Sequence, residues 1–272
     1  MSETKVEPNG IAVIDKQPGW TSHDVVAKCR GILGTKKIGH SGTLDPDATG
    51  VLVLGVGKCT RILQYLTALP KHYVGDIVLG AETTTLDASG EVTATFDMSS
   101  VTLSEVKKAA TQLTGNINQI PPMVSALKVD GRRLHEIARE GREVERQPRP
   151  VTVHQFNVTS TDHPLIFRCD VRCSTGTYIR SLAADLGKLL EGGAHLINLR
   201  RLSIGSFTVE EFTSATLQRI KDVDEKVHAY LSLNDSATND AKSIDKKIAS
   251  GEKVGQCYGF PISIKDNICI TG

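Results

Sequence analysis

The sequence lacks the cysteine patterns of metal-binding and redox proteins. None of its six cysteines belongs to a Cys-x-x-Cys pair, which excludes the usual zinc-ribbon and thioredoxin-like spacings. A chain of 272 residues can bury enough apolar surface to fold without disulfides. Cys169 and Cys173 fall on the apolar side of a predicted strand, so we expect them to be reduced core residues. The other cysteines are Cys29, Cys59, Cys257 and Cys269.

The sequence also lacks a membrane-spanning or secretory segment. Its first ten residues are polar, and the apolar run Val51–Val56 is far too short to cross a bilayer. We therefore expect a cytoplasmic protein. The net charge of only +1 points to no particular partner, so any nucleic-acid site must come from local clusters of Lys and Arg.

A nucleotide-triphosphate site is not supported either. The segment Gly55–Thr60 looks superficially like a phosphate-binding loop. That loop requires a glycine at position 52 and Ser or Thr at position 59. The chain has Leu52 and Cys59 at these positions.

The most informative stretch is Gly39–Gly50, which reads GHSGTLDPDATG and leads into the apolar run Val51–Val56. Pro46 has no N–H and restricts Asp45 to an extended or turn conformation. This turn can hold a carboxylate steadily beside a buried strand. Taken alone, the Leu-Asp-Pro tripeptide also fits an ordinary surface turn.

Hydrophobic periodicity and capping signals predict alternating strands and helices. Thr102 and Glu105 have the spacing of a capping box, as do Thr21 and Asp24. Predicted helices start at Thr21 and Thr102 and extend over Thr60–Leu69 and Thr177–Leu190. Predicted strands are Ile11–Asp15, Val51–Val56, Lys71–Gly80, Val151–Val158 and Leu165–Cys173.

Arg180 has unusual neighbours for a helical arginine. Three, four and seven residues further along the helix lie Ala183, Ala184 and Gly187, which form a face of small residues. Small neighbours indicate close packing, so we predict that Arg180 is buried and has an anionic partner.

The loop at Asp45, together with Val51–Arg61, resembles the second motif of the TruB family of tRNA pseudouridine synthases. Further similarity to this family lies in the Lys-x-Tyr segment at Tyr73 and in the Gly-Thr-Tyr-Ile-Arg motif at Arg180. The resemblance covers roughly residues 10 to 230 in the family's order. The remaining matching segments are Lys16–Ser22, Gln119–Lys128 and Gly192–Leu202.

The resemblance implies an α+β fold, in which helices flank a mixed, largely antiparallel sheet with a central RNA-binding cleft. It implies a catalytic domain over residues 1–230, with an RNA-gripping insertion at about 119–150. Residues 231–272 would form a short C-terminal tail or a reduced appendage of the PUA type. The polar stretch Asn234–Asp240 reads as the linker between them.

The function implied is isomerisation of the T-loop uridine of tRNA, at position 55, to pseudouridine. In the family, the counterpart of Asp45 is catalytic and that of Arg180 pairs with it, while the counterpart of Tyr73 stacks on the flipped base. The resemblance leaves open whether the carboxylate attacks C6 or C1′, or assists glycal formation. The implied substrate contacts are His40, Tyr178, Leu199, Lys16, Lys128 and Arg132.

The resemblance further implies a monomer that acts on the T arm of tRNA without metal, cofactor or protein partner. The sequence departs from the family at Thr84, where an acid is usual, and at His135, where tyrosine is more usual. Three other functions stay open. They are an RNA-binding or RNA-folding module without catalysis, a guide-RNA-dependent relative, and a hydrolase or metal enzyme built on His40, Asp45 and Asp47.

Overall fold

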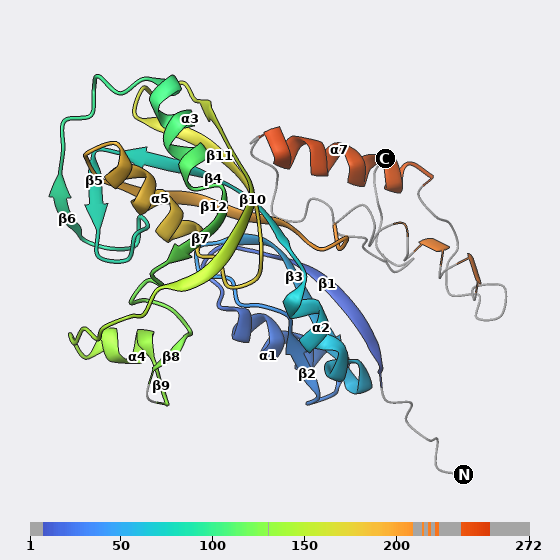
Figure 1. The fold of residues 1–272 in the computed structure, drawn as a ribbon. Helices are drawn as coiled ribbons and strands as arrows, with labels where there is room; N and C mark the ends of the chain where they lie inside the picture. The colour runs from blue at the N-terminus through green and yellow to red at the C-terminus, as the bar shows by residue number, and fades with distance from the viewer. Residues whose placement is uncertain are drawn as a thin grey trace, which may run out of the picture.

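The computed structural model describes residues 8–129, 131–208 and 235–250, and a few isolated residues between the last two ranges. One eight-stranded sheet organises this part of the chain (Figure 1). Its strands are β1 (Gly10–Lys16), β2 (Ile38–His40), β3 (Thr49–Val56), β4 (Lys71–Leu79), β7 (Gly115–Gln119), β10 (Arg149–Ser160), β11 (Ile166–Cys173) and β12 (Ala194–Ile204).

The strand order of this sheet is β1-β3-β12-β4-β11-β10-β7, and β2 pairs with the last three residues of β3, from Leu54 to Val56. β12 runs parallel to β3, and the other strand pairs are antiparallel. The mixed, largely antiparallel sheet that the family resemblance implied is therefore confirmed.

Helices and two small hairpins complete the described fold. The predicted capping boxes are both present, at Thr21 with Asp24 and at Thr102 with Glu105. The helices are α1 (Ser22–Leu33), η1 (Gly57–Ile62), α2 (Leu63–Ala68), α3 (Leu103–Gln112), α4 (Leu134–Arg139), α5 (Ile179–Leu189) and α7 (Ala237–Ser250). The hairpins pair β5 (Ala81–Thr83) with β6 (Val92–Thr95), and β8 (Lys128–Val129) with β9 (Arg132–Arg133).

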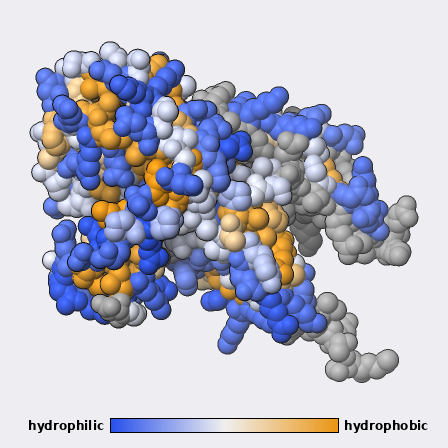
Figure 2. Space-filling model, in the orientation of Figure 1, coloured by the Kyte–Doolittle hydropathy of each residue, from blue (hydrophilic) through white to orange (hydrophobic). Residues whose placement is uncertain are grey.

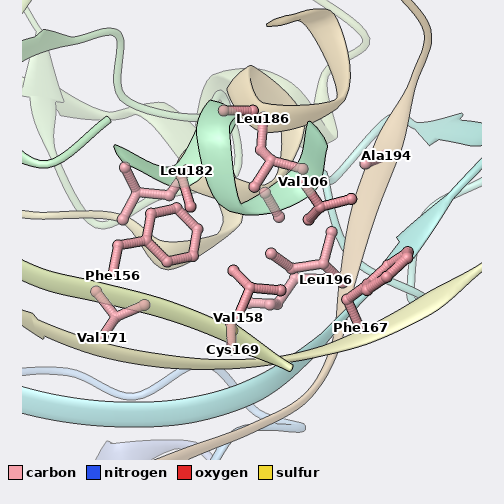
Figure 3. Packing of buried hydrophobic residues seen from close by; sticks show 14 of the residues in the cluster. Val106, Phe156, Val158, Phe167, Cys169, Val171, Leu182, Leu186, Ala194 and Leu196 are labelled. Atoms are coloured by element: carbon pink, nitrogen blue, oxygen red, sulfur yellow. The ribbon is translucent and has the colours of Figure 1, made fainter. Parts of the chain in front are cut away.

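The main core lies between one face of the sheet and the helices α3 and α5 (Figure 3). Leu182 and Leu186 of α5 are fully buried there, as are Cys169 and Cys173 of β11. Both thiols are free, so the prediction of reduced core cysteines is confirmed. Burial raises the pKa of Cys169 to about 12 and that of Cys173 to about 11.

β3 is buried on both faces, as its continuous apolar run predicts. Leu52 and Leu54 pack with Val25 and Val26 of α1 on one side. On the opposite side, Val51 and Val53 join Val13, Ile204 and residues of the α2 segment. The strand that follows the Asp45 loop is thus held rigidly.

The segment between β7 and β10 forms a small unit with its own apolar cluster of Met123, Leu134 and Ile137. In Figure 1 it extends from the sheet as the α4, β8 and β9 lobe. It lies between Gln119 and Arg149, the part of the chain where the resemblance implied an insertion. Hydrophilic residues cover much of the face drawn in Figure 2.

The C-terminal expectations fall mostly outside the described residues, which end at position 250. The predicted linker Asn234–Asp240 is wrong for its second half, because Ala237–Asp240 forms the first turn of α7. The Asp240 amide donates to the carbonyl of Ser236, and the Ser236 hydroxyl donates to the Asp240 carboxylate. None of the helices described is long and apolar enough to cross a membrane.

Candidate active site

A cavity of about 350 Å³ opens where the Asp45 loop meets the centre of the sheet. Residues from separated parts of the chain line it, which is typical of a ligand site. They include Gly42–Asp45, Lys71, Tyr73, residues 125–127 and 174–180, Leu199 and Arg201.

The Asp45 loop is a stiff turn, as the sequence predicted. Gly42 and Gly50 have φ angles of 112° and 99°, which favour glycine over any residue with a Cβ. The Leu44 amide donates to the Ser22 hydroxyl at 2.9 Å, and that hydroxyl donates to the Leu44 carbonyl at 3.2 Å. Leu44 is therefore fixed in the core, while the side chain of Asp45 remains 40% exposed.

Arg180 pairs with Asp45 through two contacts. Arg180 Nε lies 2.9 Å from Asp45 Oδ2, and Nη2 lies 3.2 Å from Oδ1. The arginine side chain is only 4% exposed. Both parts of the prediction made from its small-residue face are thus confirmed: Arg180 is buried, and its partner is a carboxylate. This two-point contact fixes the orientation of the Asp45 carboxylate.

The remaining donors of Arg180 hold two further segments. Nη1 donates to the Thr85 carbonyl and Nη2 to the Val124 carbonyl, each at 2.8 Å. A second carboxylate, that of Asp87, lies 3.5 Å from Arg180 Nε. Sequence reasoning did not assign Asp87 to the site, although it lies three residues after Thr84, where the resemblance leads one to expect an acid.

Tyr73 and Leu199 line the same cavity as Asp45. Tyr73 belongs to β4 and lies opposite Val171 of β11 and Arg201 of β12. Burial raises the pKa of Tyr73, so its phenol is neutral near pH 7. The aromatic ring and the leucine give the cavity an apolar wall beside a charged one.

Tyr178 also lines the cavity and stands immediately before α5. Gln119, at the end of β7, holds it through two hydrogen bonds. The Tyr178 amide donates to Gln119 Oε1 at 2.8 Å, and Gln119 Nε2 donates to the Tyr178 carbonyl at 3.1 Å. Gln119 is buried, and sequence reasoning gave it no role.

His40 ends β2, two residues before the cavity-lining Gly42. Its ring meets that of His23 edge to face, with 5.8 Å between centroids. Burial, with a smaller effect of His23, lowers the pKa of His40. The imidazole is therefore mainly neutral at physiological pH.

Lys16 lies in the interior rather than on an RNA-facing surface. It is 1% exposed, and its Nζ donates to the carbonyls of Trp20 and Pro46 at 2.7 Å and of Gln17 at 3.0 Å. Burial lowers its pKa to about 8. The structure thus places this expected substrate contact behind the Asp45 loop, which it holds through Pro46.

Lys128 and Arg132 lie on the exposed β8–β9 hairpin of the insertion. Arg132 forms an ion pair with Glu140, so part of its charge is satisfied within the protein. Lys128 lies on the other strand of the hairpin, β8, opposite Arg133 in the strand register.

A metal site on His40, Asp45 and Asp47 finds no support in the geometry. Among the residues that the structure describes, no group of three or more His, Cys, Asp or Glu side chains could hold a metal ion. The carboxylate of Asp45 is directed to the Arg180 guanidinium instead. The arrangement is an oriented carboxylate on the wall of a cavity with an aromatic side.

Comparison with protein families gives three matches along the chain. The N-terminal domain of the TruB family of pseudouridylate synthases matches residues 30–179. The C-terminal domain described for tRNA pseudouridylate synthase B matches residues 180–237. A family described as amidase matches residues 211–272, which lie largely outside the described part of the structure.

The curated relatives carry a consistent name. The tRNA pseudouridine synthase B of Rhodococcus jostii is 51% identical over 217 residues, which are 78% of this chain and 70% of that protein. The protein of the same name from an Arthrobacter species is 40% identical over 260 residues, 91% of this chain and 84% of its own.

Among solved structures, a chain from a crystal structure of a Cbf5-Nop10-Gar1 complex superimposes with a TM-score of 0.58 at 30% identity. The match covers 79% of this chain and 56% of that one. The motifs, the sheet and these relatives agree: the chain belongs to the TruB family of tRNA pseudouridine synthases.

Proposed function

We propose that this protein isomerises the T-loop uridine of tRNA, at position 55, to pseudouridine, with Asp45 as the catalytic carboxylate. The observation that carries the proposal is the two-point contact between Arg180 and Asp45 at the wall of the cavity. Arg180 sets a guanidinium directly against the carboxylate and fixes its direction. A nucleophile or base of this kind has to be both ionised and oriented.

The reaction breaks the N1–C1′ bond of uridine and forms a C5–C1′ bond. The proton on C5 is released, and N1 gains a proton, so the product is an isomer of the substrate. Attack of Asp45 on C6, attack on C1′ and assistance in glycal formation each require an ionised carboxylate beside the nucleotide. The proposal does not depend on which of the three routes operates.

Tyr73 and Leu199 would hold the target base after it leaves the T loop. Flipping a base out of a structured RNA costs a few kcal/mol, and stacking on an aromatic ring returns about 1–3 kcal/mol per base. Both side chains line the cavity of Asp45. Tyr178 contacts the same nucleotide, and His40 fills the gap that the base leaves in the RNA.

The insertion would grip the T arm through Lys128 and Arg132. Both residues are exposed on one hairpin. Contacts to phosphates release counterions, so the affinity for RNA should fall steeply, by orders of magnitude, between about 50 and 200 mM salt. A flat salt response would contradict the proposed grip.

We propose that the protein acts in the cytoplasm as a monomer, with tRNA as its only required partner.

The test is release of tritium from a T-arm stem-loop that carries 5-tritiated uridine. Wild-type protein should release it, and Asp45→Asn should bind the same RNA without release. Asp47→Asn is the matched control, because Asp47 is an exposed acid two residues away on the same turn. It should keep wild-type activity, whereas a metal site shared by both aspartates predicts that both variants fail.

Two outcomes would point away from the proposal. Tight RNA binding without release by the wild type would favour an RNA-binding or RNA-folding module. Release only after addition of a guide RNA would favour the guide-dependent mode. Refolding of tRNA by Asp45→Asn would show a folding role that is separate from catalysis.

A further inference from the structure

Arg201 is a buried charged residue that the proposed mechanism does not use. Its side chain is 1% exposed, and it is among the largest fully buried side chains in the described residues. It lies on β12, the strand between β3 and β4. In the register of the sheet it lies opposite Gly50 of β3 and Tyr73 of β4. A buried guanidinium of this kind needs partners for its donors.

The donors of Arg201 reach both ends of the Asp45 loop. Nη2 donates to the carbonyl of Gly42 at 3.1 Å, and Nη1 lies 3.4 Å from that of Thr43. Nε donates to the carbonyl of Val51 at 2.7 Å. One side chain thus ties the entry and exit of the turn that presents Asp45, and the planar guanidinium fixes their separation.

Close packing of β3 against β12 makes this reach possible. A Cβ on Gly50 would lie 2.1 Å from the Arg201 carbonyl oxygen. Glycine therefore lets the two strands approach at the point where the loop becomes β3. The loop is held from its other side by Lys16, whose ammonium binds the Pro46 carbonyl.

Arg201 also lies against Tyr73, the aromatic side of the cavity. Burial raises the pKa of the Tyr73 phenol, and Arg201 opposes this through its charge and a hydrogen bond. Arg201 and Tyr73 are also direct partners in the register of β12 and β4, so Arg201 neighbours the aromatic wall of the cavity as well as the carboxylate-bearing loop. Arg201 itself forms part of the cavity lining.

We propose that Arg201 is a positioning residue that sets the place of the Asp45 carboxylate relative to Tyr73. It acts through the backbone of residues 42–51 and does not itself react. The inference rests on the proposed function only in taking Asp45 as the reacting group. Arg180 orients the carboxylate directly, whereas Arg201 determines where the turn that carries it lies.

Arg201→Lys tests this proposal because it keeps the charge but cannot span three carbonyls in the planar geometry of a guanidinium. Arg200→Lys is the matched control. Arg200 is the adjacent residue of β12, is 15% exposed at its side chain, and pairs with Asp15 through an Nη2–Oδ2 contact of 2.8 Å. The Arg200 variant also loses a largely buried guanidinium but leaves the loop carbonyls satisfied.

The first measurement is amide hydrogen exchange of the peptide that covers the Asp45 loop, which needs no RNA. Arg201→Lys should raise its exchange by about tenfold or more, since local opening becomes easier. Arg200→Lys should not, and α5 should stay protected in both variants. If the wild-type protein released no tritium, the proposed function would be wrong. The exchange measurement on the Asp45 loop would still decide whether Arg201 holds that loop in place.

The second measurement separates RNA binding from the chemical step. Single-turnover tritium release per folded molecule should fall about 10- to 100-fold in Arg201→Lys, since small misplacements have such effects, while the Kd for RNA stays within about threefold of wild type. Arg201→Gln, which retains only one amide donor group, should be slower still. Three outcomes would overturn the positioning role. They are unchanged tritium release and exchange in Arg201→Lys, an equal loss of tritium release in the Arg200 control, and failure of both Arg201 variants to fold.

Discussion

Gln119 and Tyr178 are 59 residues apart in the sequence and exchange two hydrogen bonds in the structure. The amide side chain of Gln119 satisfies the backbone N–H and C=O of Tyr178 at the point where α5 begins. The end of β7, where the insertion starts, is thereby joined to the segment that carries Tyr178 and Arg180. The position of Tyr178 is set by its backbone, which leaves its ring free to line the cavity.

Gln119→Leu should destabilise the protein and slow the reaction. The replacement has similar volume but leaves two backbone groups of Tyr178 without their side-chain partner, at a cost of about 1–3 kcal/mol. Urea unfolding measures this loss, and single-turnover tritium release should fall about tenfold as Tyr178 shifts. Gln112→Leu, at the exposed end of α3, should change stability by less than about 0.5 kcal/mol.

Asp87→Asn should slow the chemical step without weakening RNA binding. Asp87 Oδ2 faces Arg180, whereas Oδ1 accepts from Thr85 Oγ1 and from the Ser89 amide. Asparagine preserves the acceptor for the turn and removes the charge, so Arg180 loses its second anionic partner. We expect single-turnover release to fall about tenfold, with Kd for the stem-loop nearly unchanged.

Asp97→Asn provides a close control for that experiment. Asp97 Oδ1 accepts from the amide and hydroxyl of Ser99 at 3.0 and 2.7 Å, a turn of the same kind. Among the described residues, the carboxylates that pair with Arg180 are those of Asp45 and Asp87. The Asp97 variant should release tritium at the wild-type rate. Equal behaviour of the two variants would show that the charge of Asp87 has no part in the reaction.

Gly50→Ala and Gly31→Ala should change stability in opposite directions. At Gly50 the backbone has a φ of 99°, and a Cβ would meet the Arg201 carbonyl, so we expect a loss of more than about 2 kcal/mol. At Gly31, inside α1, a Cβ meets nothing within 4 Å. Alanine there should stabilise by up to about 1 kcal/mol. Urea midpoints of the two variants measure the contrast.

Lys71 should make stability depend on pH in the alkaline range. Burial, followed by the charge of Arg201, lowers the pKa of Lys71 from 10.5 to about 8. Between these values the unfolded chain binds more protons than the folded one, so this residue's contribution to stability increases as pH rises. That contribution is complete above pH 10.5 and is lost as pH falls through about 8.

The measurement compares the free energy of unfolding of wild type and Lys71→Met at several pH values from 7 to about 10.5. Wild type should gain relative to the variant as pH rises. The wild-type curve alone is less informative, because the raised thiol pKa values of Cys169 and Cys173 act in the opposite direction. Lys58→Met, an exposed site, should show no such trend. A constant difference between wild type and Lys71→Met would contradict the prediction.

Local patterns predicted the two halves of the central pair, a stiff turn at Asp45 and a buried Arg180 with an anionic partner, and the family resemblance joined them. The turn at Asp45 and the burial of Arg180 follow from residues close to each in the sequence, so both could be predicted from it. The roles of Lys16 and Asp87 depend on distant segments. Pro46 reaches the ammonium of Lys16 from 30 residues away, and a turn after β5 brings Asp87 beside Arg180.

The position of β12 was also beyond local reasoning. Its parallel pairing with β3 is set by tertiary packing, and this pairing places Arg201 opposite Gly50. The two adjacent arginines of β12 were informative in retrospect. Successive side chains of a strand point to opposite faces, so within a buried strand both Arg200 and Arg201 need a partner inside the protein.

The strand order determines when the site can be completed during folding. β3 and β4 are consecutive in the sequence, yet β12, which ends at Ile204, lies between them. The part of the sheet with β1 and β3 and the part that runs from β4 to β7 therefore join only through β12. This strand is synthesised about 120 residues after β4. On the ribosome, we expect the cavity to stay incomplete until β12 has emerged, because that strand brings Leu199 and Arg201 to a cavity whose other walls were made earlier.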